Sequence, residues 1–198
     1  MIWSFDDGPN EHSTRQNMDV LEAHGIKGTF FLVGQHVERH PAIAREIHDR
    51  GHRVGNHSYS HPNLRTLSRD GVLDELVRCE TAIIEAGVPR PTVFRPPYGE
   101  TDDQVELVAS ELGLEQLLWT VDSADWKSTT EQIIENVLST EPTGDDVVLL
   151  HDVTQTTRAL PALLERFLAA RDADPTKAEA GLGLPLVVSQ GRAGPQAP

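Results

Sequence analysis

The sequence predicts a single α/β domain built on a parallel β-sheet, and three observations support this fold class. Short runs of β-branched and aromatic residues alternate with amphipathic helical segments along the chain. Seven predicted strands in 198 residues correspond to about 28 residues per strand, close to one βα unit. No linker or low-complexity tract divides the chain. This alternation favours a parallel sheet covered by helices, either closed into a barrel or left open.

The predicted strands are short apolar runs, at residues 2–5, 29–33, 53–55, 92–95, 116–121, 147–151 and 186–189. The predicted helices follow a 3.6-residue period, at residues 13–24, 41–50, 68–86, 102–112, 130–140 and 158–171.

Helix ends are marked by particular residues. Four glycines stand where helices should stop, namely Gly25, Gly51, Gly87 and Gly113. Thr129 and Gln132 are spaced as a capping box. The domain is predicted to span residues 1–190, with a long loop at 172–184 and a disordered tail at 191–198.

Composition limits the classes of partner. The chain has 17 Lys plus Arg against 31 Asp plus Glu, a net charge of −14. Nucleic acid and anionic membrane surfaces attract clustered basic residues, so neither is an expected partner. No apolar run reaches the roughly 18 residues that a membrane span needs, and we expect no membrane insertion and a monomer. The one cysteine, Cys79, is predicted to be a buried, inert thiol.

Three pairs of histidines have the i, i+4 spacing that is found in some metal sites: His36 with His40, His48 with His52, and His57 with His61. Nine histidines give some such pairs by chance, so position must decide among them. The first two pairs are interpreted as solvated surface residues. The third pair directly follows a predicted strand, which favours a functional role.

Polar side chains gather where five of the predicted strands end. In parallel α/β sheets and barrels, the loops after the strands converge on one face. We therefore expect these distant residues to meet in one site; they are Asp6, Asp7, His57, His61, Arg95, Asp122, Asp125, His151 and Asp152.

Two imidazoles and a carboxylate are a frequent ligand set for Zn²⁺, with one position left for water. A water bound there has its pKa lowered towards neutrality and becomes a usable nucleophile. The other carboxylate of the Asp-Asp pair could then act as a base. Taken alone, Asp-Asp-Gly-Pro at residues 6–9 could equally be a plain turn.

Two further residues, Arg95 and Trp126, have both a functional and a structural interpretation. Arg95 begins Arg-Pro-Pro-Tyr-Gly and could sit near the Asp pair, or be an ordinary surface arginine. Trp126 could line the site or pack in the core. His151 ends an apolar strand, where a histidine normally has a partner. Asp125 could hold one ring nitrogen of His151 and keep the imidazole charged, as a general acid requires.

The sequence resembles the polysaccharide deacetylases of carbohydrate esterase family 4, the NodB-homology domain. Five motifs of that family occur in order, and the resemblance covers roughly residues 1–190. They are Ser-Phe-Asp-Asp-Gly-Pro at 4–9, His-Ser-Tyr-Ser-His at 57–61, Arg-Pro-Pro-Tyr at 95–98, Asp-Ser-Ala-Asp-Trp at 122–126 and Leu-Leu-His-Asp at 149–152.

The resemblance implies a distorted (β/α)₇ barrel, a single domain that binds one divalent metal ion. Zn²⁺ is favoured, and Co²⁺, Mn²⁺ or Ni²⁺ are alternatives. The implied catalytic base is Asp6 and the implied general acid is His151. Arg95 would orient Asp6, and Asp125 would orient His151.

The resemblance also implies the metal ligands, which are Asp7, His57 and His61. The Tyr98 N–H would face the oxyanion, and Trp126 and Leu149 would wall the pocket around the acetyl methyl.

The implied activity is hydrolytic N-deacetylation of N-acetylglucosamine units in chitooligosaccharides or chitin, which releases acetate. Deacetylation of peptidoglycan, cleavage of O-acetyl esters of xylan, and non-catalytic sugar binding are the alternatives. Met1 is followed directly by an apolar stretch and Asp6-Asp7, without room for a signal peptide. We therefore expect either a cytoplasmic protein or the trimmed form of a secreted one.

Overall fold

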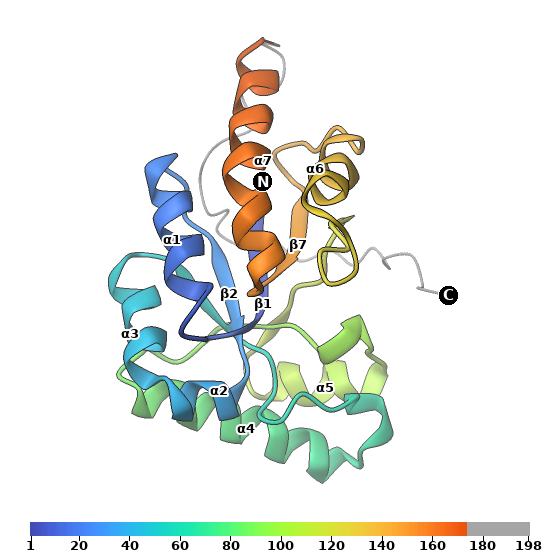
Figure 1. The fold of residues 1–198 in the computed structure, drawn as a ribbon. Helices are drawn as coiled ribbons and strands as arrows, with labels where there is room; N and C mark the ends of the chain where they lie inside the picture. Colours follow the sequence, from blue (N-terminus) through green and yellow to red (C-terminus); the bar gives the residue numbers. More distant parts are fainter. Residues whose placement is uncertain (174–198) are drawn as a thin grey trace.

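The computed structural model describes residues 1–173, and these form one α/β unit around a parallel sheet (Figure 1). The strands are β1 (Ile2–Gly8), β2 (Thr29–Leu32), β3 (Arg53–Asn56), β4 (Val93–Phe94), β5 (Glu115–Gln116), β6 (Val121–Asp122) and β7 (Val147–His151). Their order across the sheet is β5-β4-β3-β2-β1-β7-β6, and every neighbouring pair is parallel.

The sheet is curled, because its two edge strands are close together in the sequence. Strand β5 ends at Gln116 and strand β6 begins at Val121, at opposite edges of the sheet. Five residue steps of extended chain reach at most about 18 Å. Six strand spacings in a flat sheet would separate the edges by about 29 Å. The sheet therefore forms an incomplete barrel, which agrees with the predicted distorted (β/α)₇ fold.

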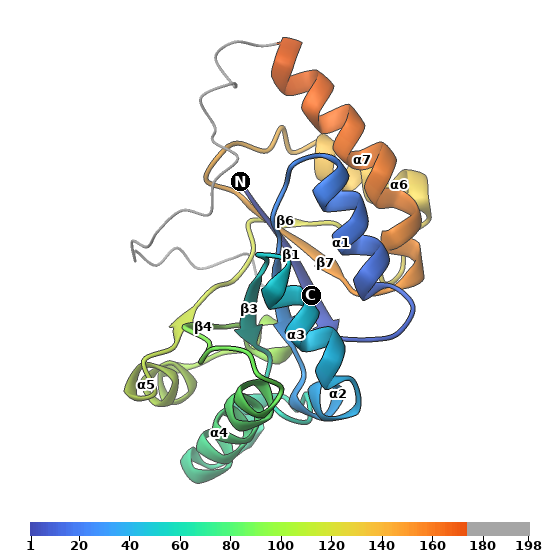
Figure 2. The ribbon, with the colours of Figure 1, turned by 90° about the vertical axis from the view of Figure 1, so that its left-hand side faces the viewer.

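The seven helices within residues 1–173 lie around the outside of this sheet (Figures 1 and 2). They are α1 (Thr14–Ala23), α2 (Gly34–Arg39), α3 (Pro41–Asp49), α4 (Arg69–Glu85), α5 (Asp103–Glu111), α6 (Thr130–Leu138) and α7 (Thr154–Ala173). Neighbours contact one another in the order α6, α7, α1, α3, α4, α5. Short 3₁₀ turns occur at Leu64–Thr66 and Pro97–Gly99. No helix within residues 1–173 is long and apolar enough to cross a membrane.

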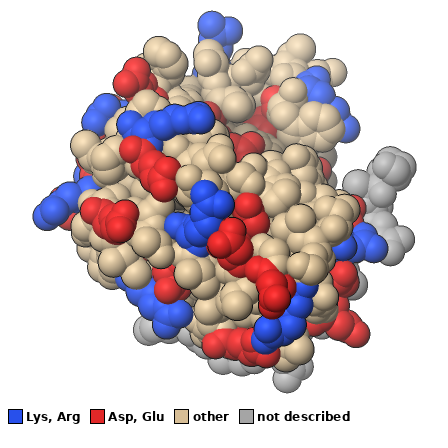
Figure 3. Space-filling view, turned by 90° about the horizontal axis from the view of Figure 1, so that it is seen from below, with Lys and Arg blue, Asp and Glu red and all other residues tan. Residues whose placement is uncertain are grey.

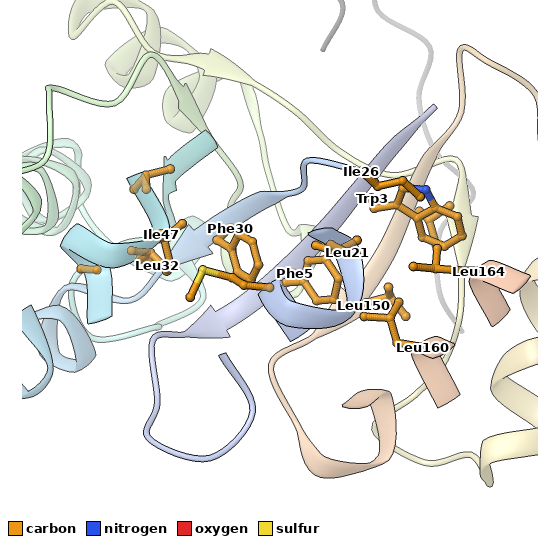
Figure 4. Close-up of a cluster of buried hydrophobic side chains, with 14 of the residues drawn as sticks. Trp3, Phe5, Leu21, Ile26, Phe30, Leu32, Ile47, Leu150, Leu160 and Leu164 are labelled. Carbon is orange, nitrogen blue, oxygen red and sulfur yellow. The ribbon is translucent and has the colours of Figure 1, made fainter. Parts of the chain in front are cut away.

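The hydrophobic core lies between the sheet and this helical layer (Figure 4). Trp3 and Phe5 of β1 point into it, and the ring of Phe5 stacks on Phe30 at 4.9 Å between centroids. Because side chains alternate along a strand, Ser4 and Asp6 face the other side, towards the inside of the barrel. The pattern that buries β1 against the helices therefore also directs Asp6 towards the interior.

Most predicted elements are confirmed within one or two residues, including the strands at 29–33, 53–55 and 147–151. The Thr129–Gln132 capping box forms. The four glycines at helix ends adopt positive φ angles between 67° and 85°. Cys79 is fully buried, as expected, and burial raises the pKa of its thiol to about 12.

The predicted strand at 116–121 was wrong, because this run supplies two short strands at opposite edges of the sheet. The Leu117 N–H donates to Phe94 O, and the Leu117 carbonyl accepts from Arg95 Nε. These bonds hold the chain beside β4 before it crosses to the opposite edge of the sheet, where β6 pairs with β7. Helix α2 was not predicted, and α7 begins at Thr154 rather than at residue 158.

One histidine interpretation was also wrong. His48 is exposed, but His52 is 3% exposed, and its Nδ1 accepts from the Gly28 N–H at 3.1 Å. The predicted strand at 186–189, the tail at 191–198, and the loop at 172–184 apart from its first two residues lie outside the described residues.

Gly55 in β3 makes room for an aromatic ring inside the barrel. A Cβ atom at this position would lie 2.5 Å from Cδ1 of Phe31. That ring in turn lies 4.2 Å below the guanidinium carbon of Arg95. The absence of a side chain at Gly55 therefore leaves the space in which the Phe31 ring packs against Arg95.

We expect Gly55→Ala to lower the free energy of unfolding by about 1–3 kcal/mol, because the Phe31 ring must be displaced. Urea denaturation measures this change. The double variant with Phe31→Leu should lose less stability than the sum of the losses of the two single variants, because the smaller side chain relieves the overlap. A Gly55→Ala protein as stable as the unchanged chain would show that the ring has free space to move.

Candidate active site

Five strands deliver polar side chains to the carboxyl end of the barrel, as the sequence predicted. β1 carries Asp6 and Asp7, and β7 carries His151, which pairs in register with Asp6. His57 and His61 follow β3, Arg95 follows β4, and Asp125 follows β6.

Asp7, His57 and His61 form a three-residue cluster whose possible ligand atoms all lie within 4.8 Å of one another. Asp7 Oδ1 is 3.5 Å from His57 Nε2 and 3.2 Å from His61 Nε2. It is buried and accepts no hydrogen bond from the described residues. Ligands at the usual bond lengths of tetrahedral Zn²⁺ are separated by roughly 3.3 Å. The cluster therefore fits a divalent cation in both spacing and chemistry.

The surroundings of the Asp7–His57–His61 cluster favour this use of its atoms. The Nδ1 atom of His57 is 2.7 Å from the Arg95 carbonyl, which leaves Nε2 directed at Asp7. Burial raises the pKa of Asp7, but the adjacent imidazoles of His57 and His61 outweigh it and hold this pKa well below its usual range. The carboxylate is therefore ionised and available as a ligand.

Asp6 and Arg95 form a buried ion pair beside the cluster. Arg95 Nη1 donates to Asp6 Oδ1 at 2.8 Å, and the two residues are 0% and 3% exposed. The second carboxylate oxygen, Oδ2, lies 3.7 Å from His57 Nε2. The surface interpretation of Arg95 is thereby excluded. The pair holds one oxygen of Asp6 and leaves the other beside the cluster.

His151 is held by Asp125 through two hydrogen bonds. Its Nδ1 lies 2.6 Å from Asp125 Oδ1, and its backbone N–H donates to Oδ2 at 2.6 Å. Thr156 Oγ1 also donates to Oδ2. Burial alone would lower the pKa of His151, but the hydrogen bond and charge of Asp125, with the charges of Asp6 and Asp7, raise it to about 9. The imidazole is therefore charged at neutral pH.

The three remaining predicted site residues differ in burial. Tyr98 has a positive φ of 62° and a 64% exposed side chain, and its ring meets His61 edge-on at 4.7 Å between centroids. Trp126 is 59% exposed, so the core-packing alternative is wrong. Leu149 is buried on β7, two residues before His151 and hence on the same face of the strand.

Two neighbours of the site were not recognised from the sequence. His36, interpreted as a solvated residue, is half-buried, and its Nδ1 lies 2.8 Å from the Asp7 carbonyl. Its place in α2, four residues after the end of β2, could have indicated this. Asp152 was noted only as a polar strand end, yet its carboxylate accepts from Thr14 Oγ1 and Asn17 Nδ2 and so ties the first turn of α1 to the end of β7.

Charges of both signs lie around the end of the molecule where the strands finish. Figure 3 shows this face from below, with acidic and basic side chains interspersed among many uncharged ones. The net charge of −14 is therefore not gathered there as one continuous acidic surface.

Comparison with known proteins gives consistent results. A protein-family model described as polysaccharide deacetylase matches residues 1–117, which include the first three motifs. The chain is 36% identical over 156 residues to the peptidoglycan-N-acetylglucosamine deacetylase PgdA of Listeria monocytogenes, covering 79% of this chain and 33% of that protein. It is 35% identical over 150 residues to the chitooligosaccharide deacetylase of Rhizobium leguminosarum bv. trifolii, covering 75% and 69%.

Among solved structures, a family 4 carbohydrate esterase from Streptomyces lividans in complex with acetate aligns with a TM-score of 0.80 and 36% identity, over 86% of this chain and 88% of that one. The chain spans about a third of the length of the Listeria relative. The sequence match and the shared fold agree: the chain belongs to the polysaccharide deacetylase family, the NodB-type domain of carbohydrate esterase family 4.

Proposed function

We propose that the chain is a metal-dependent hydrolase that removes the N-acetyl group from N-acetylglucosamine units of chitooligosaccharides or chitin. One observation carries this proposal: a buried, unpartnered carboxylate oxygen of Asp7 faces the Nε2 atoms of His57 and His61 directly beside Asp6. That arrangement provides both a cation site and an adjacent base. Family membership agrees with hydrolytic deacetylation.

Asp7, His57 and His61 would hold the cation, with Zn²⁺ favoured and Co²⁺, Mn²⁺ or Ni²⁺ as alternatives. When bound, a divalent cation lowers the pKa of water and polarises the acetyl carbonyl. Asp6 accepts the proton of the attacking water through Oδ2, because Oδ1 is engaged by Arg95. The water oxygen forms a bond to the carbonyl carbon, and the carbonyl oxygen becomes an oxyanion.

The oxyanion and the leaving group need separate stabilisation. The Tyr98 N–H, presented by the left-handed backbone at that residue, donates to the oxyanion, an interaction worth about 3 kcal/mol in proteases. His151, kept charged by Asp125, donates its proton to the amide nitrogen as the carbon–nitrogen bond breaks. Acetate and a free amine are the products. Trp126 and Leu149 would wall the pocket around the acetyl methyl.

The choice of polymer rests on charge. An anionic wall polymer would be repelled by a net charge of −14, with a strength that falls with salt. A neutral N-acetylated oligosaccharide meets no such barrier. Peptidoglycan is the second candidate, because it is the substrate named for the Listeria relative.

Asp6→Asn should abolish acetate release from chitotetraose, because the base is lost. Treatment of the unchanged chain with a chelator should do the same, and added Zn²⁺ or Co²⁺ should restore the activity. Acetate is measured by an enzyme-coupled assay, and circular dichroism checks that the variant is folded, since the buried Arg95 loses its charged partner. Undiminished activity after either treatment would disprove the mechanism.

The pH profile should depend on Asp125. A general acid must be protonated, so kcat/KM should fall as pH rises through the pKa of His151, which Asp125 helps to raise to about 9. Asp125→Asn lowers that pKa towards its usual value, so the fall should begin at least one pH unit lower.

Asp122→Asn is the matched control, because Asp122 ends β6 three residues before Asp125 but is exposed, and within residues 1–173 its side chain accepts only from the Ala124 N–H. A profile that is merely scaled down in Asp125→Asn, without moving along the pH axis, would count against His151 as the acid.

The substrate class can be tested with mass spectrometry of products from chitooligosaccharides, peptidoglycan fragments and acetylated xylan, each with added Zn²⁺. We expect the largest acetate loss from chitooligosaccharides. A preference for xylan would indicate an esterase, since an ester has a better leaving group and needs less help from His151. Sugar binding by calorimetry without any acetate release would favour a non-catalytic domain.

A further inference from the structure

The loop that carries both proposed histidine ligands has a strained backbone. Residues 57–61 join strand β3 to the following turn, and two of them, Ser58 and His61, have φ angles of 62° without being glycine. Such left-handed positions persist only where the surrounding structure holds them in place. The positions of His57 and His61 therefore depend on whatever fixes this loop.

All five backbone N–H groups of the loop are bonded. The N–H of His57 donates to Leu32 O, that of Ser58 to Asn56 Oδ1, and that of His61 to Ser58 Oγ. The two that remain, Tyr59 and Ser60, both donate to a single side chain on helix α4.

That side chain is Glu75. Its Oε2 accepts from the N–H of Tyr59 at 2.9 Å and of Ser60 at 2.8 Å, and its Oε1 accepts from Ser60 Oγ at 2.7 Å. Glu75 is 8% exposed, and within residues 1–173 no Lys, Arg or His forms an ion pair with it. A buried carboxylate without a cation is costly unless it is fully hydrogen-bonded. Its three bonds all go to the residues between the two histidines.

The two histidines differ in how much they depend on this contact. His57 is fixed independently, by the end of β3 and by the bond between its Nδ1 and Arg95 O. The side chain of His61 is 26% exposed, and its position follows from the Tyr59–Ser60 segment before it. Loss of the Glu75 bonds should therefore release His61 more than His57.

We propose that Glu75 is a positioning residue for the metal site, which holds the 57–61 loop so that the Nε2 atoms of His57 and His61 converge on Asp7. This inference rests on the proposed metal-dependent function. Glu75 touches neither substrate nor metal, and it acts through the loop backbone. Its role is to keep the ligand geometry formed before the cation arrives.

The test is the affinity of metal-stripped protein for Co²⁺, measured by competition with a chelating dye and by the visible absorption of the bound ion. Glu75→Met keeps the length of the side chain but removes both acceptors, and we expect Co²⁺ to bind about 10–100-fold more weakly. Glu75→Gln retains one oxygen that can accept from both N–H groups, and should bind within a few-fold of the unchanged chain.

Glu80→Met is the matched control, because Glu80 lies on the same helix and pairs with Arg90 at 2.8 Å, away from the loop. It should leave the affinity for Co²⁺ unchanged. With Glu75→Met, excess Co²⁺ should restore most of kcat, because the ligands themselves remain.

A folded Glu75→Met variant that binds Co²⁺ as tightly as the unchanged chain would overturn the proposal, even if its melting temperature fell. Equal weakening by Glu75→Gln and Glu75→Met would also overturn it, because charge rather than loop position would then be the cause.

If Glu75→Met does not fold, Ser60→Ala removes only the Oε1 bond and should weaken binding a few-fold; no change would reject the inference. If the unchanged chain binds no Co²⁺, the proposed function itself fails.

Discussion

The buried ion pair between Arg95 and Asp6 is the interaction on which the site depends. Arg95 is fully buried, and besides Asp6 it contacts the Leu117 carbonyl, the Phe31 ring and, through its own carbonyl, His57. One residue thus connects the proposed base, a proposed metal ligand and the segment that crosses between the sheet edges. Such a pair contributes little net stability, because desolvation opposes it, but removing one partner costs about 3–5 kcal/mol. It fixes geometry rather than adding stability.

The site is assembled largely from strained backbone. Asp7, His61 and Tyr98 all have positive φ angles, at 71°, 62° and 62°. Each such position costs about 1–3 kcal/mol and persists only where neighbours hold it. For His61 the holding group is the buried Glu75, which accepts from the N–H groups of the two preceding residues, Tyr59 and Ser60. Two further pairs, Arg95 with Asp6 and Asp125 with His151, fix the proposed carboxylate base and the proposed charged acid.

Local patterns predicted the strands that hold the site, because β2 and β7 are mostly apolar runs, β1 begins with apolar and aromatic residues, and polar residues follow the end of each strand. The run at 116–121 was misassigned, since its division into two edge strands depends on the curl of the whole sheet and on bonds to Phe94 and Arg95. Helix α2 is only six residues long and begins at a glycine, so no periodicity marks it. Glu75 resembles any solvent-facing helical glutamate; only the packing of the 57–61 loop against α4 buries it.

The most direct measurement of the central claim is an anomalous difference map from crystals grown with Zn²⁺. We predict one strong peak about 2.0–2.2 Å from Asp7 Oδ1, His57 Nε2 and His61 Nε2, with Asp6 Oδ2 next to the open position of the ion. A map with no peak at this cluster, or an ion bound by other residues while the two histidines point apart, would contradict the account.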